Sequence, residues 1–192
     1  MKIREYGTVP FILHPKQNIG EVRQCVLENF GRIRYELPFI NALCVEIPRE
    51  KIQTIKSNRR IASMSEDIQV SKLPTKAGPA PLRAPRLIQR PIRSGEGIAI
   101  AVIDTGVAPH YDLIRPFNRI RYFRDFVNGR KRPYDDDGHG THVSGIALGN
   151  GYISGHYIGT APGACLVALK ALDREGNGNV SDILAAMQWI YD

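Results

Sequence analysis

The chain has 192 residues, of which 43% are hydrophobic and 23% charged, a composition typical of folded globular proteins and not of disordered ones. No apolar run approaches the roughly 18 residues of a membrane span, and the first 15 residues lack the apolar core of a secretory signal. The net charge of +7 comes from basic residues in three separate places without a zinc-finger, RNP or KH signature. We therefore expect neither a nucleic-acid nor a membrane partner.

The cysteines indicate the compartment. The chain contains three, Cys25, Cys44 and Cys165, none in a CxxC pair and each in an apolar stretch. An odd number of buried thiols is typical of a reducing environment. We therefore expect a cytoplasmic protein.

Residues 1–72 are predicted to form a small α+β domain. Apolar patterning predicts strands over 8–14, 41–47 and 60–70, the second of them half-buried. Helical spacing after Asn18, a residue type suited to helix capping, predicts a helix over 18–31, and a shorter helix follows Pro48. We interpret the domain as β-α-β-β-α-β, the ferredoxin-like arrangement, which has one strand more than the three predicted here.

Residues 73–94 are predicted to be a cleavable linker. This stretch holds five prolines and several basic residues, and neither a helix nor a central strand tolerates that proline density. Exposed segments of this kind are preferred sites of proteolysis.

Residues 95–192 are predicted to form an α/β domain with a parallel sheet. Apolar runs predict strands over 97–104 and 164–172, buried on both faces, with a weaker strand over 119–126. Helices are predicted over 142–149 and over 180–191, the latter capped by Ser181. Because so few strands would leave apolar edges bare, we expect a chain cut within this domain rather than a short protein completed by a partner.

Asp104 is the first candidate catalytic residue. It ends a buried strand and is followed by Thr105 and Gly106, at the sheet edge where α/β proteins place their sites. Three interpretations are open: a turn residue, the water-activating carboxylate of a retroviral-type aspartic protease, or the carboxylate that orients a catalytic histidine.

His139 is the second candidate, in the stretch DDDGHGTHVSG of residues 135–145. Aspartic proteases have no use for a histidine here. His139 and His142 could share a helix face, but zinc proteases use H-E-x-x-H spacing with a glutamate base. The pattern therefore disfavours metal catalysis.

With both motifs in view, the sequence resembles the subtilisin-like serine proteases (subtilases). The resemblance covers residues 101–113, 135–149 and 159–190, in the family order Asp, then His. Residues 1–72 resemble a subtilase propeptide in layout. Because a signal sequence is lacking, the chain resembles the intracellular branch of the family. The implied architecture is a propeptide (1–72), a linker (73–94) and the first half of the catalytic domain (95–192).

The resemblance implies roles for single residues. Asp104 would orient His139, and His139 would be the general base. Gly176, Asn177 and Gly178 would form the edge against which an extended substrate adds as a strand. His142 is expected to be a buried core histidine, and Thr105 and Thr141 to hold the two motifs by local hydrogen bonds.

The chain departs from the family pattern at the nucleophile. No serine lies in a G-T-S-x-A-type motif, and Ser144, the nearest to the pattern, occupies a small-residue packing position. The implied enzyme is thus a serine endopeptidase precursor that acts on polypeptides and is inhibited by its own propeptide. We expect these 192 residues alone to be inactive. The alternatives are a non-catalytic propeptide-type inhibitor or folding chaperone, and an aspartic protease.

We expect no tight cofactor. Many subtilases hold calcium in the loop corresponding to residues 148–159, but here Asn150 is the sole side-chain candidate ligand. His156, in the same loop, is expected at the surface. The sequence leaves the oligomeric state and the preferred substrate open.

Overall fold

The computed structural model describes residues 7–72, 94–153 and 155–192. These form a mixed α/β structure that divides into two units. The first comprises the chain up to Gln69 together with Asn179–Asp192, and the second is Val70–Gly178. The linker predicted over 73–94 lies, apart from Ser94, outside the described residues. The predicted domain boundaries stay a prediction.

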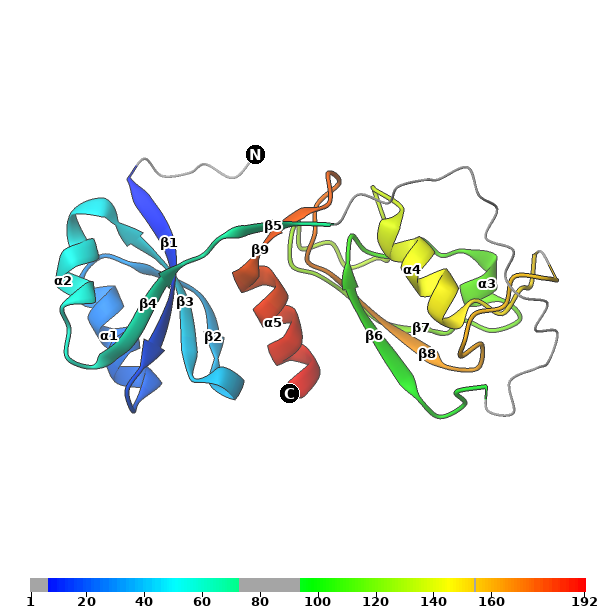
Figure 1. Cartoon of the computed structure of the whole chain (residues 1–192), viewed down its shortest axis with the longest axis horizontal. Coiled ribbons are helices and arrows are strands. Elements are labelled where there is room, and N and C mark those ends of the chain that lie inside the picture. Colours follow the sequence, from blue (N-terminus) through cyan, green and yellow to red (C-terminus); the bar gives the residue numbers. More distant parts are fainter. Residues whose placement is uncertain (1–6, 73–93, 154) are drawn as a thin grey trace. The chain divides into compact units, whose positions relative to one another are not determined.

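An antiparallel sheet forms the centre of the first unit, with the strands in the order β2-β3-β1-β4 (Figure 1). The chain order is β-α-β-β-α-β, followed by the helix α5 from the end of the sequence. The elements are β1 (Thr8–Pro15), α1 (Ile19–Glu28), β2 (Arg32–Leu37), β3 (Ala42–Pro48), α2 (Ile52–Lys56), β4 (Ile61–Glu66) and α5 (Val180–Tyr191), with 3-10 turns at Pro38–Ile40 and Arg49–Lys51.

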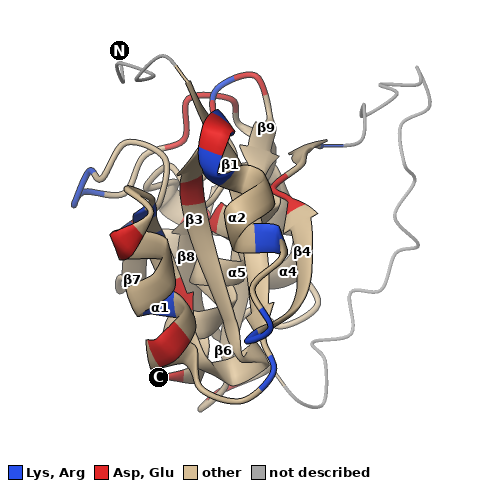
Figure 2. Cartoon of the chain, turned by 90° about the vertical axis from the view of Figure 1, so that its left-hand side faces the viewer, with Lys and Arg blue, Asp and Glu red and all other residues tan. Residues whose placement is uncertain are grey.

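The apolar core of the first unit lies where α1 and α2 pack on the sheet. Asn18 caps α1 as predicted, because its side chain accepts the N–H of Gly20 at 2.7 Å. Val22 and Val26 of α1 and Ile55 of α2 are fully buried. Figure 2 shows acidic and basic residues interspersed on α1, so this helix carries no surface of a single charge.

The strand β3 is buried on both faces, whereas the sequence predicted a half-buried strand. Leu43, Val45 and Ile47 face the core as expected, but Cys44 on the other face is only 1% exposed. The helix α5 packs near β2, where Tyr35 donates to Asp182 at 2.7 Å. Burial raises the pKa of the Cys44 thiol to about 12, so this thiol stays protonated and unreactive.

The start of α5 also differs from the prediction. Asn179 precedes the helix, and the side chain of Ser181 does not cap it. Instead, the backbone N–H of Ser181 donates to the carboxylate of Asp67 at 2.9 Å. A carboxylate more than a hundred residues earlier in the chain thus satisfies a free N–H at the helix start, where negative charge is favourable.

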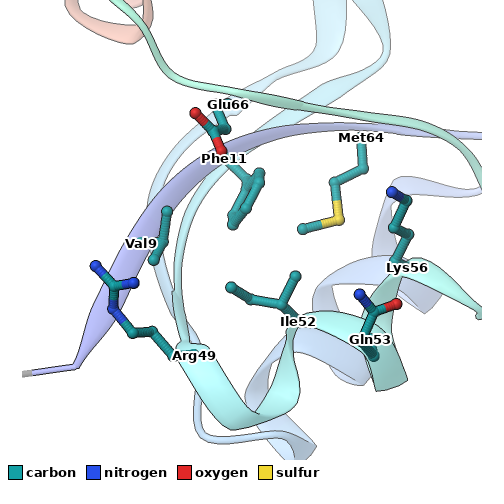
Figure 3. A pocket seen from close by; sticks show the side chains of 8 residues that line it. All are labelled: Val9, Phe11, Arg49, Ile52, Gln53, Lys56, Met64 and Glu66. Carbon is teal, nitrogen blue, oxygen red and sulfur yellow. The ribbon is translucent and has the colours of Figure 1, made fainter.

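A shallow pocket of about 420 Å³ lies on the first unit between β1, β4 and α2 (Figure 3). Phe11, Ile52 and Met64 give it an apolar floor, while Arg49 and Lys56 stand at its edge. It holds no nucleophile and no histidine. The candidate catalytic residues Asp104 and His139 lie in the second unit.

A parallel three-stranded sheet forms the second unit, with the strands in the order β6-β8-β7. Its elements are β6 (Ala99–Asp104), α3 (Tyr111–Ile114), β7 (Ile120–Asp125), α4 (His139–Leu148) and β8 (Cys165–Lys170). The core on the side of α3 and α4 includes Leu113, Leu148 and Leu166. The prediction that β6 is buried on both faces is wrong, because it is an edge strand on which Ala99 and Ala101 are exposed.

Two short strands, β5 (Gln69–Ser71) and β9 (Asn177–Asn179), pair with each other. The last predicted strand of the first domain, residues 60–70, is therefore two strands: β4 ends at Glu66 and β5 begins at Gln69. Next to this pair, the N–H of Lys72 donates to the carbonyl of Gly176 at 2.8 Å.

Every helix in the described part of the chain is too short or too polar to serve as a transmembrane segment.

Candidate active site

The structure brings Asp104 and His139 into direct contact. Asp104 is the last residue of β6 and His139 the first of α4. The imidazole Nδ1 lies 2.8 Å from Oδ1 and 2.9 Å from Oδ2 of the carboxylate. The Asp104 side chain is 12% exposed and that of His139 21%, so the pair is shielded from solvent without being sealed off.

This geometry defines what the imidazole can do. A carboxylate beside Nδ1 favours the tautomer with its proton on Nδ1, which leaves the lone pair on Nε2. In the described part of the chain, nothing hydrogen-bonds to Nε2. The ring is therefore prepared to take a proton from a donor outside the pair and to be stabilised when it becomes positively charged.

A glycine allows the helix to approach the strand. A Cβ on Gly140 would overlap the carbonyl oxygen of Gly106, in the turn after β6. The N–H of Gly140 instead donates to the hydroxyl of Thr105 at 2.9 Å. Any side chain at position 140 would push α4 away from β6 and lengthen the contact between His139 and Asp104.

Asp135 connects the two motifs, a role that the sequence did not reveal. Its Oδ1 accepts from the hydroxyl of Thr105 at 2.9 Å and the N–H of Gly138 at 2.8 Å. Its Oδ2 accepts from both the N–H (2.8 Å) and the hydroxyl (2.6 Å) of Thr141. Burial would raise the pKa of Asp135, but these hydrogen bonds outweigh it and lower the pKa to about 2. The local roles predicted for Thr105 and Thr141 agree with these contacts.

A fully buried lysine supports the same region. The ammonium of Lys170, the last residue of β8, donates to the carbonyls of Thr105 (2.6 Å) and Leu172 (2.9 Å) and to the carboxylate of Asp136 (2.6 Å). It also lies 5.1 Å from the centre of the Tyr134 ring. One lysine in the apolar run ACLVALKAL was the signal that could have singled it out.

We expect Lys170→Met to destabilise the second unit by about 2–4 kcal/mol, because two buried carbonyls and a carboxylate lose their donor. Amide hydrogen exchange in β6 and β8 of the folded chain would measure this loss. The matched control is Lys56→Met, which changes an exposed lysine of α2 in the first unit. Equal exchange rates in the two variants would contradict the expectation.

The predicted substrate-binding residues, Gly176, Asn177 and Gly178, lie at or beside β9 and face β5 across the two-stranded sheet. The side chain of Lys72, directly after β5, reaches Asp137, and its ammonium donates to the carboxylate Oδ2. Asp137 Oδ1 in turn accepts the backbone N–H of His139 at 3.1 Å. This ion pair therefore lies next to the candidate base in the chain.

The structure corrects the prediction for His142. This side chain is exposed on α4, because Gly140, Ser144 and Leu148 form the buried face of that helix. Ser144 is fully buried, and its hydroxyl has no hydrogen-bond partner in the described part of the chain. Ser144 thus fits the packing role expected of it. His156 is exposed, as predicted.

In the described part of the loop after α4, two side-chain oxygens accept backbone hydrogen bonds. The side-chain oxygen of Asn150 already accepts the N–H of Tyr152 at 3.1 Å. Asp112, the nearby carboxylate, accepts the N–H of Ile153 at 2.9 Å. Throughout the described ranges, no cluster of three or more His, Cys, Asp or Glu side chains could hold a metal ion.

Comparison with known proteins identifies the family. The peptidase S8 domain, described as the subtilase family, matches residues 95–192, which include both Asp104 and His139. The chain belongs to the subtilase family. Asp104 precedes His139 in the chain, which is the order of the aspartate and the histidine of the subtilisin triad.

Individual subtilases resemble the chain over different lengths. The serine protease AprX of Bacillus subtilis (strain 168) is 44% identical over 97 residues, which is 50% of this chain and 21% of AprX. An alkaline protease of Alkalihalobacillus alcalophilus is 35% identical over 158 residues, covering 81% of this chain and 40% of that protein. The chain thus spans less than half of the length of these relatives.

Solved structures show the same fold. The epidermin leader peptide processing serine protease (EpiP) of Staphylococcus aureus, as its S393A mutant, superposes with a TM-score of 0.69 over 96% of this chain and 48% of that one, at 17% identity. Fervidolysin from Fervidobacterium pennivorans, a keratinolytic enzyme related to subtilisin, also gives a TM-score of 0.69, at 18% identity, over 98% of this chain and 35% of that one.

Proposed function

We propose that the chain is the N-terminal part of a serine endopeptidase that hydrolyses polypeptides through an Asp-His-Ser triad. The observation that carries the proposal is the contact of His139 Nδ1 with both carboxylate oxygens of Asp104, at 2.8 and 2.9 Å. In this role Asp104 holds the tautomer and stabilises the imidazolium, while His139 takes the proton of a serine and returns it to the leaving amine. The serine itself would come from sequence beyond these 192 residues.

The residues of the first unit support a propeptide interpretation. Their β-α-β-β-α-β order and antiparallel sheet fit a ferredoxin-like domain, and β5 leads from it directly into the pairing with β9. We infer that residues 1–72 are a folding aid and inhibitor. Maturation would then cut the chain between Val70 and Arg86, in the Pro-rich stretch, and Gly176, Asn177 and Gly178 would bind the substrate strand.

We further propose that the protein is located in the cytoplasm. Cys25, Cys44 and Cys165 are all free thiols in the structure, which fits a reducing compartment such as the cytoplasm. Without a serine in the family motif, the 192 residues alone are expected to hydrolyse no peptide.

The test uses the protein encoded by the complete reading frame. We expect it to hydrolyse fluorogenic peptides near neutral pH and to be labelled covalently by a fluorophosphonate, a reagent specific for activated serines. The 192-residue chain should do neither. Activity that persists after fluorophosphonate treatment and peaks in acid would instead favour the aspartic protease alternative.

The inhibitor alternative requires a separate assay. If the chain is a non-catalytic inhibitor, the purified 192 residues should inhibit an active subtilase and the complete reading frame should encode no G-T-S-x-A-type motif. If it is an enzyme precursor, that motif should follow, and N-terminal sequencing of the processed protein should give a start within Val70–Arg86.

A further inference from the structure

We propose that the basic loop, defined here as residues 126–134, is a surface that binds acidic segments of polypeptide substrates through Arg130, Lys131 and Arg132. The inference deepens the proposed function and rests on it. The whole loop lies in the second unit, between β7 and α4. It contains one of the three basic stretches of the sequence, and that stretch has no role in the core or in the contact between Asp104 and His139.

The three cations of the basic loop face solvent. Arg130, Lys131 and Arg132 are all exposed. In the described part of the chain, none of them forms a salt bridge with a carboxylate. Because adjacent like charges repel each other, a ligand with several negative charges would relieve this repulsion as well as form new ion pairs.

The basic loop is folded around the carboxylate of Asp125, the buried last residue of β7. Its Oδ1 accepts the N–H groups of Val127 and Asn128, each at 2.9 Å. Its Oδ2 accepts the N–H of Arg130 at 3.1 Å and the hydroxyl of Tyr134 at 2.7 Å. Burial would raise the pKa of Asp125, but these hydrogen bonds outweigh it and lower the pKa. Asp125 thus stays ionised at neutral pH and holds the loop in one shape, which reduces the entropy that binding would cost.

The acidic residues that follow the basic loop have partners elsewhere in the second unit. The carboxylates of Asp135, Asp136 and Asp137 accept from the hydroxyl of Thr141 and from the ammonium groups of Lys170 and Lys72, respectively. These carboxylates are therefore engaged, and the cations of the basic loop are left for an anion from outside.

The basic loop is connected to the candidate active site. The carbonyl of Tyr134 accepts the N–H of Val107, in the turn after Asp104, at 3.1 Å. The ring of Tyr134 has the guanidinium of Arg130 4.6 Å and the ammonium of Lys170 5.1 Å from its centre. An acidic segment bound to the loop would therefore hold the rest of its polypeptide at a raised local concentration near this turn.

The chemistry of the basic loop favours a polypeptide over a nucleic acid. Surfaces that bind single-stranded nucleic acids combine cations with aromatic rings on which bases stack. The two aromatic residues of the loop are Phe126 and Tyr134, and the guanidiniums of Arg124 and Arg130 lie over their rings at 5.3 and 4.6 Å. Arginine and lysine side chains on a fixed loop suit the carboxylates of successive acidic residues, which arginine binds through two parallel hydrogen bonds.

The first arm of the experiment measures binding and needs no catalysis. The fluorescence anisotropy of a labelled glutamate-rich peptide is followed as the 192-residue chain is added, at low ionic strength. A matched peptide carries glutamine in place of every glutamate. We expect the glutamate-rich peptide to bind, the glutamine peptide not to bind, and the affinity to fall about tenfold when Arg130, Lys131 and Arg132 are all replaced by glutamine.

The control removes the same charge from the first unit. Arg49, Lys56 and Arg59 are also exposed, and replacing all three by glutamine should leave the affinity nearly unchanged. An equal loss in both triple variants would show an effect of net charge alone and overturn the surface. So would a labelled oligothymidylate that binds more tightly than the peptide and loses its affinity in the loop variant, because the site would then be one for nucleic acid.

A second variant guards against a disturbed fold. The double replacement Lys131→Gln and Arg132→Gln keeps Arg130 and its contact with Tyr134, so it is expected to retain the hydrogen-exchange protection of β6 and β8. It should still weaken binding of the glutamate-rich peptide, whereas Lys131→Arg with Arg132→Lys should restore the affinity of the wild type. An affinity that the double replacement leaves unchanged contradicts the inference.

The second arm measures kcat and KM of the protein from the complete reading frame on peptides with a glutamate-rich or a glutamine-rich tail. We expect the acidic tail to lower KM about fivefold with little change in kcat, an advantage lost in the loop variant and kept in the first-unit control. An advantage that the loop variant keeps overturns the inference. Hydrolysis of neither peptide overturns the proposed function, while the binding arm still decides whether the basic loop binds acidic polypeptides.

Discussion

Replacing His139 by alanine is expected to lower kcat/KM of the complete protein by about 10⁴- to 10⁶-fold. This is the size of the effect when a triad member is removed from subtilisin, a relative of this chain. The reason lies in the contact with Asp104 at 2.8 and 2.9 Å, which prepares Nε2 to accept a proton. The measurement is the rate of peptide hydrolysis, with the concentration of folded enzyme determined independently.

Two further variants make this result specific. Asp104→Asn keeps the shape of the side chain but no longer stabilises the imidazolium. We expect it to lower kcat/KM by about 10⁴-fold. His142→Ala changes an exposed histidine of the same helix α4 and should retain nearly full activity. If His139→Ala hydrolysed peptides as fast as the wild type in acid, with Asp104 still required, the aspartic protease interpretation would replace the triad.

Replacing Asp135 by alanine is expected to destabilise the second unit by about 3 kcal/mol or more. Its carboxylate accepts from the hydroxyls of Thr105 and Thr141 and from backbone N–H groups that include that of Gly138. Alanine would leave several of these donors without an acceptor, each at a cost of about 1–3 kcal/mol when buried. The expected result is loss of the contact between the two motifs along with loss of stability.

The measurement has to separate the two units. The single tryptophan, Trp189, lies on α5 in the first unit, whereas Asp135 lies in the second unit. Hydrogen exchange of β6 and β8 amides reports on the second unit directly. Glu175→Gln, at an exposed position, serves as the control and should change stability by less than about 0.5 kcal/mol. If Asp135→Ala lowered the stability of the second unit by an equally small amount, the role of Asp135 in holding the two motifs together would be contradicted.

The pH dependence gives an independent check on Asp135. Its pKa falls from 3.8 to about 2 on folding. The corresponding stability, about 2 kcal/mol, is fully present above about pH 4 and is lost as the pH falls toward 2. We expect the wild type to show this decline in the exchange protection of the second unit and Asp135→Asn to show a shallower one. An equal slope in both proteins would assign the acid sensitivity to other carboxylates.

Much of the fold followed from local patterns. The apolar runs ending at Asp104 and Lys170 are β6 and β8, and Asn18 caps α1 as its residue type suggests. The approach of His139 to Asp104 followed from two motifs in the family order. These features depend on residues close together in sequence or on motifs that are read as a unit.

The features that the sequence did not reveal depend on contacts between distant segments. Neither the cap that Asp67 provides to Ser181 nor the burial of Cys44 on the second face of β3 has a local signal, because both arise where α5 meets the first sheet. Lys170 falls within an apolar strand in the sequence. The residues that its ammonium contacts, Thr105 and Asp136, lie 65 and 34 positions away in the chain.

The helix α5 gives the first unit an unusual makeup, since it joins a sheet built from residues more than a hundred positions earlier. The guanidinium of Arg34 donates to the carboxylate of Asp182 at 2.9 Å, and the backbone N–H of Phe39 donates to the side-chain oxygen of Gln188 at 3.0 Å. If the chain is cut between Val70 and Arg86, as proposed, these contacts hold together two separate polypeptides. Release of the N-terminal piece then becomes a dissociation equilibrium, so dilution would favour the freed protein and concentrated solutions would retain the pair.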